Sequence, residues 1–314
     1  MPGSIAVIIP TYDHGALLRE AVESVLAQTR PATEIIVVSD GAPIDPTPFV
    51  ADLPHQGRLR ILVKPNGGAP AARDLGARHA TSEYFLFFDD DDVLLPDALE
   101  QLGDRLDARP DVVAAAGATR MVSRPGEPVW FPNPAPNDDH FDLLLDGSEY
   151  QGGATLIRAT TFWKAGGYAS NLFGIDDWFL NLRLARHGPF AVYLAPVINY
   201  REHAGSFSAK LRQLELAPSF ARQVSQLVGR GGHAAGNRLR IVMIKRYLPK
   251  VLDRLADDLR AHRWGAAALA VRSALWPLLL PWPSRSVLMT WIDMYSRRRR
   301  RLKQSDSIAT PEGA

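Results

Sequence analysis

The 314-residue sequence predicts an α/β fold, with a mainly parallel sheet flanked by helices and a helical C-terminal region after it. Three observations predict this class. Short apolar runs alternate with helical patterns between residues 4 and 117, some of those runs end in acids, and Ala, Leu and Arg dominate after residue 208. Strands alternating with helices are typical of parallel sheets, which bind ligands at the carboxyl ends of their strands.

The first expected strand is SIAVII (4–9), and the next helix is predicted from apolar residues at helical spacing between Leu18 and Leu26. Further strands are expected at EIIVVSDG (34–41), RLRILVKPNGG (58–68), YFLFF (84–88) and DVVAAAG (111–117). A helix is predicted over Ala69–Ala80, and another is expected to begin at Pro96, because proline is favoured at the first helical position. Residues 123–150 are rich in Pro, Asn and Asp and are expected to form a loop.

The net charge of +2 conceals two regions of opposite charge. Residues 1–208 hold 16 Lys and Arg against 27 acids, a net charge of −11, whereas residues 209–314 hold 20 against 7, a net charge of +13. We therefore expect a folded domain over residues 1–208, a basic helical region over 209–304 and a disordered tail over 305–314.

The absence of cysteine excludes disulfides and zinc sites built on thiolates. The first residues, MPGSIAVIIPTYD, lack the basic segment and the long apolar segment of a secretory signal. Together these features favour a cytoplasmic location.

Four consecutive aspartates, Asp89 to Asp92, follow the apolar run YFLFF. Carboxylates without His or Cys beside them suit Mg²⁺ or Mn²⁺, which proteins usually hold with one or two carboxylates plus substrate phosphates. The run thus indicates a site for a metal–diphosphate complex. Two alternatives stay open here: a solvated acidic turn, and a haloacid-dehalogenase-like phosphatase in which Asp89 would be the nucleophile.

The order of several motifs favours one family. These motifs are VIIPTYD, EIIVVSDG, NGGAPAARDLGA, DDDDVLLP, GGATLIRATTFWKAGGY, GIDDWFLNLRLARHG and YREHAGSFS. Each is weak alone, but their order and spacing over about residues 4–208 resemble the family 2 glycosyltransferases with the GT-A (Rossmann-like) fold. The resemblance implies inverting, metal-dependent transfer from a nucleotide-diphosphate sugar, expected to be a UDP-sugar, to a hydroxyl acceptor in cell-surface polysaccharide or glycolipid synthesis.

The resemblance also implies which residues bind the nucleotide and the metal. The nucleotide-side positions are Pro10, Thr11, Tyr12, Asp40, Asn66, Gly67, Arg73, Asp89, Asp90 and His203. Asp40 matches the acid that hydrogen-bonds the base, and a carboxylate can accept from the N3–H of uracil. Asp91 is expected to be the direct ligand of Mn²⁺ or Mg²⁺, with Asp89 beside it as second ligand or ribose contact. Asp90 has a lesser role in this run, and Asp92 is expected to support the loop.

The expected catalytic base is Asp177, within the DDW sequence at Asp176–Trp178. It would take the proton of the acceptor hydroxyl as that oxygen attacks the anomeric carbon. A single base opposite the departing diphosphate implies inversion. A structural alternative is that acids are favourable at any helix N-terminus.

Two further arginines and several departures from the family pattern accompany these motifs. Arg183, about two turns along the same segment, is expected to pair with nearby acids or to be structural, and Arg201 to offset phosphate charge. The departures fall at Asp13, Ser39, Ala42 and Asp74. They remove neither an expected metal ligand nor the base.

The segment Arg272–Lys303 joins an apolar Trp/Pro/Leu stretch to a basic cluster. The apolar part is too short to span a bilayer, but aromatic and basic residues together suit an anionic membrane surface. We expect peripheral attachment to the cytoplasmic face, where lipid-linked acceptors would lie; the alternative is a helical appendage packed on the catalytic domain. Nucleic acid is not an expected partner, because no recognition motif accompanies the arginines.

Two other functions are alternatives to sugar transfer. One is a nucleotide-sugar-binding assembly subunit without activity, which the intact Asp40, Asp89, Asp91 and Asp177 disfavour. The other is the dehalogenase-like phosphohydrolase, which needs a lysine downstream of the acidic strand, whereas Lys64 precedes it.

Overall fold

The computed structural model describes residues 1–13, 15–122, 129–130, 139–147, 150–169, 172, 175–201, 222–229, 232–262 and 264. The chain divides into two compact units, Met1–Ala209 and Lys210–Ala314.

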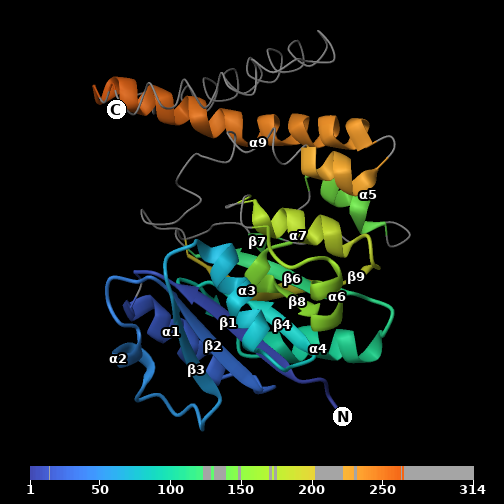
Figure 1. Cartoon of the computed structure of the whole chain (residues 1–314). Helices are drawn as coiled ribbons and strands as arrows, with labels where there is room; N and C mark the ends of the chain where they lie inside the picture. Colours follow the sequence, from blue (N-terminus) through green and yellow to red (C-terminus); the bar gives the residue numbers. More distant parts are fainter. Residues whose placement is uncertain are drawn as a thin grey trace, which may run out of the picture. The chain divides into compact units, whose positions relative to one another are not determined.

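Within the described residues, the first unit contains a nine-stranded sheet in the order β3-β2-β1-β4-β8-β6-β9-β5, with β7 paired to β6 (Figure 1). The strands are β1 (Ile5–Thr11), β2 (Glu34–Asp40), β3 (Leu59–Lys64), β4 (Tyr84–Phe87), β5 (Val93–Leu94), β6 (Ala114–Met121), β7 (Val129–Trp130), β8 (Thr155–Arg158) and β9 (Phe190–Tyr200). The helices of this unit are α1 (Gly15–Leu26), α2 (Thr47–Val50), α3 (Ala69–His79), α4 (Ala98–Ala108), α5 (His140–Leu145), the short 3₁₀ helix η2 (Gly152–Ala154), α6 (Ala159–Lys164) and α7 (Asp176–Leu184).

The sheet has a parallel half and a mixed half. Strands β3, β2, β1 and β4 all run parallel, so their carboxyl ends share one edge. Strand β8 is antiparallel to both β4 and β6, while β9 is parallel to β6. The predicted α/β class is confirmed, and the acids after β2 and β4 lie at the same edge, with β1 between the two strands.

Helices cover both faces of the parallel half. Ile5, Val7 and Ile9 belong to a core cluster that includes apolar residues of α1 and α4. Ile8 alternates with them and faces α3, where a Cβ at Gly76 would lie 2.4 Å from its Cγ2 atom. Glycine at this position thus allows α3 to approach β1 closely. Burial on both faces explains why β1 is an uninterrupted apolar run rather than an alternating one.

The sequence missed several short elements. The predicted loop over 123–150 contains β7 and α5 among its described residues. Helix α5 has six residues, too few for a clear periodic pattern, and Asp139 caps it by accepting a 3.2 Å hydrogen bond from the Asp142 amide. Helix α4 begins at Ala98, so Pro96 precedes the helix instead of starting it.

The second unit is helical where it is described. Helix α9 (Gly232–Arg260) has 29 residues, and residues 222–228 are also helical. The predicted helical C-terminal region is therefore confirmed in this part. Among the described helices, none is both long enough and apolar enough to cross a membrane. The segment 272–303, expected to contact membrane, and the tail 305–314 lie outside the described residues.

Candidate active site

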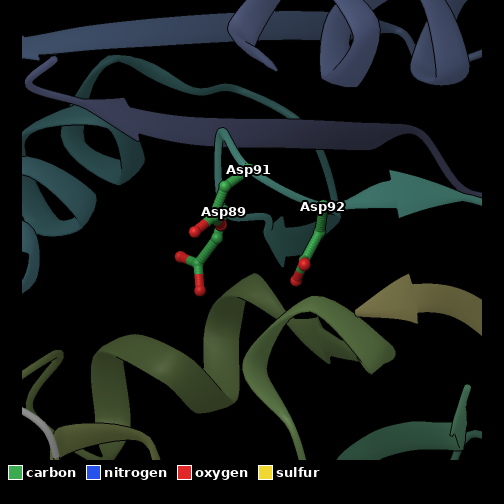
Figure 2. A group of neighbouring side chains, drawn as sticks. All are labelled: Asp89, Asp91 and Asp92. Carbon is green, nitrogen blue, oxygen red and sulfur yellow. The ribbon is translucent and has the colours of Figure 1, made fainter. Parts of the chain in front are cut away.

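The acidic loop after β4 gathers three carboxylates (Figure 2). One oxygen from each of Asp89, Asp91 and Asp92 lies within 4.8 Å of the others. Three hard oxygen donors at this separation fit a divalent cation such as Mn²⁺ or Mg²⁺. The side chain of Asp89 is 41% exposed and therefore accessible from solvent, whereas Asp92 is buried. Asp90 is buried and is not part of this group.

Arg201, at the end of β9, holds the acidic loop in place. Its backbone amide donates to the buried carboxylate of Asp92 over 3.0 Å, and its Nε donates to the carbonyl oxygen of Asp91. The guanidinium also contacts Glu20 of α1. Burial, with the charges of Asp89 and Asp91, raises the pKa of Asp92 well above its ordinary value, against the effect of Arg201. Arg201 is thus engaged with the loop, and its expected role in offsetting phosphate charge stays a prediction.

Arg73 of α3 joins the acidic loop to the start of α7. Its Nη2 donates to Asp89 over 2.6 Å and its Nη1 to Asp176 over 2.8 Å, and Nη1 lies 3.8 Å from Asp177. The side chain is buried. Burial disfavours its charge, but Asp177 and Asp89 hold the pKa of Arg73 well above its ordinary value. A permanent cation therefore lies between the proposed metal side and the proposed base.

Asp177 lies in the first turn of α7 and has close neighbours on three sides. The hydroxyl of Tyr168 donates to its Oδ1 over 2.8 Å, and Arg73 approaches the same oxygen. On another side, a Cβ at Gly152 would lie 2.9 Å from Oδ2. Burial raises the pKa of Asp177, Arg73 and Tyr168 lower it, and Asp89 raises it further. The side chain of Asp177 is 32% exposed. A carboxylate with a raised pKa that a substrate can reach is suited to accept a proton.

Asp40, at the end of β2, holds the glycine-rich turn before α3. Its carboxylate accepts from the backbone amides of Gly67 over 2.9 Å and Gly68 over 2.7 Å, and it also contacts the amine of Lys64. Gly68 has φ +86°, a conformation that glycine adopts without strain. The turn brings Asn66 next to Gly41, where a Cβ would lie 2.6 Å from the Asn66 amide.

A small pocket lies beside the ends of β1 and β2. Its lining consists of Thr11, Tyr12, Asp13, Gly15, Ala42, Ile44, Pro46 and Phe49. Thr11 is buried, whereas the ring of Tyr12 is exposed, and Pro10 precedes them inside β1. An exposed aromatic ring beside an apolar hollow can stack against a flat ring system.

The predicted residues fall into two groups, one around Asp40 and one around Arg73. Asp40, Asn66 and Gly67 meet at the turn before α3, and Thr11 and Tyr12 line the nearby pocket. Arg73 contacts Asp89 and lies close to Asp177. His203 lies outside the described residues.

The sequence does not reveal the parts played by Gly152 and Tyr168, the membership of Asp92 in the carboxylate group, or the pairing of Asp176 with Arg73. Tyr168 and Gly152 both belong to the motif GGATLIRATTFWKAGGY, but neither residue is charged, and only their tertiary contacts distinguish them.

Comparison with known proteins identifies the relatives of this chain. The sequence profile described as "Glycosyl transferase family 2" matches residues 6–165. An uncharacterised glycosyltransferase of Rickettsia typhi is 30% identical over 225 residues, covering 67% of this chain and 68% of that protein. An uncharacterised glycosyltransferase of Rickettsia felis is 27% identical over 215 residues, covering 66% of this chain but 35% of that protein. This chain thus spans about a third of the length of the second relative.

Two solved structures share the fold. TarS of S. aureus, in complex with UDP-GlcNAc, superposes with a TM-score of 0.61 at 15% identity, covering 87% of this chain and 81% of that one. The mannosyltransferase PcManGT of Pyrobaculum calidifontis, in complex with GDP-Man and Mn²⁺, gives a TM-score of 0.58 at 19% identity, covering 94% and 85%. At these identities the likeness shows the fold, which confirms the GT-A architecture.

Proposed function

This chain belongs to glycosyl transferase family 2 and is a glycosyltransferase, and from that premise we propose that it transfers a sugar from a UDP-sugar to a hydroxyl acceptor with inversion and with the help of a divalent metal. The observation that supports the proposal most is the position of Arg73. It contacts Asp89 of the acidic loop and Asp176 of α7, and it lies 3.8 Å from Asp177. A donor held at the loop and an acceptor beside Asp177 would therefore meet in one site.

The acidic loop is the proposed metal site. Asp91 is the proposed direct ligand, with Asp89 beside it, and the structure adds Asp92 to the group of carboxylates that fits Mn²⁺ or Mg²⁺. A bound divalent ion would stabilise the negative charge on the departing nucleoside diphosphate. The complex of PcManGT with GDP-Man and Mn²⁺ is consistent with this assignment.

Asp177 is the proposed catalytic base. Both described polar contacts of its carboxylate are on Oδ1, so Oδ2 is the oxygen expected to receive the proton of the acceptor hydroxyl. The guanidinium of Arg73 lies between Asp177 and Asp89. Its positive charge reduces the repulsion between the two carboxylates. The proposal further places the base and the diphosphate on opposite sides of the anomeric carbon, which is the arrangement for inversion.

The nucleotide is proposed to bind along the ends of β1 and β2. Tyr12 offers its exposed ring and Thr11 lines the same pocket, while Pro10, Asn66 and Asp90 are proposed neighbours of the nucleotide. Asp40 accepts from Lys64 and two amides among the described residues, and because a carboxylate has about four acceptor positions, the proposed fourth donor is the N3–H of uracil. The TarS complex with UDP-GlcNAc favours UDP, whereas the PcManGT complex holds GDP-Man.

The acceptor is proposed to be a saccharide or lipid-linked saccharide at the cytoplasmic face of a membrane, within cell-surface polysaccharide or glycolipid synthesis. The support is the net charge of +13 on residues 209–314 and the Trp- and Arg-rich segment 272–303. Cell fractionation of the full chain and of a chain lacking residues 284–314 tests this. We expect only the truncated chain to be fully soluble; equal solubility of both would contradict membrane attachment.

A donor screen tests the central proposal. Thermal unfolding is measured with UDP-, GDP- and TDP-sugars, each with Mn²⁺, Mg²⁺ or EDTA. A ligand present at a free concentration of 100 times its Kd stabilises the folded protein by about 2.7 kcal/mol. We expect the largest rise in Tm with a UDP-sugar and Mn²⁺, followed by slow UDP release from that donor. Binding without any release or transfer would instead favour the assembly subunit. Release of phosphate without sugar transfer would favour a phosphohydrolase, although Lys64 contacts Asp40 and not the acidic loop.

A further inference from the structure

Tyr168 contacts the proposed base, Asp177, through its hydroxyl. We propose that its hydroxyl is a positioning group, which orients the Asp177 carboxylate with Oδ2 toward the acceptor and keeps that carboxylate ionised. The supporting contact is the 2.8 Å hydrogen bond that Tyr168 donates to Oδ1. This inference rests on the proposed function, because it presumes that Asp177 is the base.

The ring of Tyr168 is fixed by packing on several sides. It meets Phe87 edge to face at a centroid separation of 4.9 Å and lies 6.0 Å from the ring of Phe162. The guanidinium of Arg73 stacks over it at 5.2 Å from the centroid. The ring is buried. With so little freedom, its hydroxyl has a defined direction, and that direction is toward Asp177.

The backbone beside Tyr168 is held by two helices. Asp74 of α3 accepts a 2.9 Å hydrogen bond from the Tyr168 amide. Arg183 of α7 donates to the carbonyl oxygens of Ala165, over 2.8 Å, and of Gly167. Gly167 has φ +65°, and a Cβ there would lie 2.8 Å from Asp74, so only glycine fits this turn without strain. Through these contacts the half-buried Arg183 supports the turn before Tyr168.

Glycine packs against Asp177 on another side. A Cβ at Gly152 would lie 2.9 Å from Oδ2 and 3.1 Å from Oδ1, so the carboxylate can lie this close only because residue 152 has no side chain. The two carboxylate oxygens differ in their hydrogen bonds: Oδ1 accepts from the hydroxyl of Tyr168, whereas no described residue donates to Oδ2.

The chemistry assigns each proton and bond. The acceptor oxygen forms a bond to the anomeric carbon as its proton passes to Asp177 Oδ2. The bond from that carbon to the phosphate oxygen breaks, and its electron pair leaves with the diphosphate. Tyr168 keeps its own proton throughout, because burial and the charge of Asp177 raise its pKa well above the ordinary value.

The pKa of Asp177 is the property that the hydroxyl of Tyr168 should change. Among the described residues, the charged and titratable groups that act on Asp177 are Arg73, Asp89 and Tyr168, and the charged Asp176 precedes it in the chain. A donated hydrogen bond favours the ionised form of a carboxylate. If the hydroxyl is removed while the three charged neighbours stay, the pKa of Asp177 should rise.

The experiment measures this pKa without requiring turnover. Protein labelled with ¹³Cγ-aspartate is titrated by NMR as wild type, Tyr168→Phe and Tyr150→Phe, and Asp177→Asn identifies the resonance. Tyr150→Phe is the matched control, because Tyr150 is equally buried and its hydroxyl contacts His140 over 2.6 Å and not Asp177. We expect the Asp177 midpoint to rise by about one pH unit in Tyr168→Phe and to stay constant in Tyr150→Phe.

Activity gives the second readout. The acid limb of the pH profile of kcat/KM for donor hydrolysis should move upward with the midpoint in Tyr168→Phe, with an unchanged KM for the donor. An Asp177 midpoint in Tyr168→Phe equal to that of wild type, or an equal rise in both tyrosine variants, overturns the proposal. If Tyr168→Phe does not fold, Asp74→Ala, which releases the Tyr168 amide, must raise the midpoint in the same direction, and no rise overturns it as well. The titration is independent of the Asp177→Asn transfer assay, which tests the proposed function.

Discussion

The acidic loop after β4 and the start of α7 both present carboxylates, but they are built differently. The loop collects Asp89, Asp91 and Asp92 within four consecutive positions. Asp177 instead depends on Arg73, Gly152 and Tyr168, which belong to α3, η2 and the turn after α6. A group assembled from neighbours in sequence can be read as a motif, whereas one assembled by tertiary contacts depends on the whole fold. The two regions should therefore respond differently to substitution.

The largest effect is expected at the base. Asp177→Asn removes the proton acceptor and keeps the shape, so transfer should fall by about 10²- to 10⁴-fold. Donor binding, measured by calorimetry with the donor and Mn²⁺, should stay close to that of wild type, because the acidic loop is intact. Normal transfer by this variant would show that the base is another residue.

The second effect tests the link between the two regions. Arg73→Met removes a buried cation that pairs with the buried Asp176 and so breaks a buried ion pair, and the free energy of unfolding should fall by about 3–5 kcal/mol. Arg158→Met is a suitable control, because Arg158 donates to the carbonyl oxygens of Val112 and Leu106. Loss of these two hydrogen bonds removes no cation from a carboxylate. Urea unfolding of both variants makes the comparison. Equal losses would mean that the link is ordinary packing and not charge pairing.

The same contrast decides how much of the site could be predicted from the sequence. Asp40 and Asp91 could be predicted because Asp40 ends the apolar strand β2 and Asp91 belongs to the acidic run after β4, and such strand ends share one edge in a parallel sheet. Arg73 and Asp176 form a buried pair across 103 positions of sequence, and no local pattern encodes that contact. The hydroxyl of Tyr168 escaped notice for a similar reason, because its direction is set by Phe87, Phe162 and the turn at Gly167. The fold class was predictable from local periodicity, while the surroundings of the base required tertiary structure.

The third effect concerns the acidic loop. Asp91→Ala should weaken Mn²⁺-dependent nucleotide binding by about 10- to 100-fold, which is the loss typical even of residues that only support a metal ligand. Asp104→Ala is the control, because Asp104 is an exposed acid of α4 that pairs with Arg30. Calorimetric titration with UDP in Mn²⁺ and in EDTA separates the metal-dependent part. An unchanged difference between the two conditions in Asp91→Ala would remove this residue from the metal site.

The smallest effect tests whether Asp177 depends on the space beside it. Gly152→Ala places a methyl group about 2.9 Å from Oδ2, closer than real Cβ atoms approach such an oxygen, so the carboxylate must turn away. Because the change leaves Asp177, the acidic loop and the nucleotide pocket chemically intact, kcat should fall by about tenfold, as expected from a small misplacement of a reacting group, while the KM for the donor stays constant. The neighbouring residue supplies the control: a Cβ at Gly153 would make ordinary contacts of 3.4 Å with Phe88 and 3.5 Å with Ile198, away from Asp177. A similar kcat in the two alanine variants would mean that the base tolerates displacement. The contrast between a base positioned by tertiary contacts and a metal site formed by a local motif would then no longer hold.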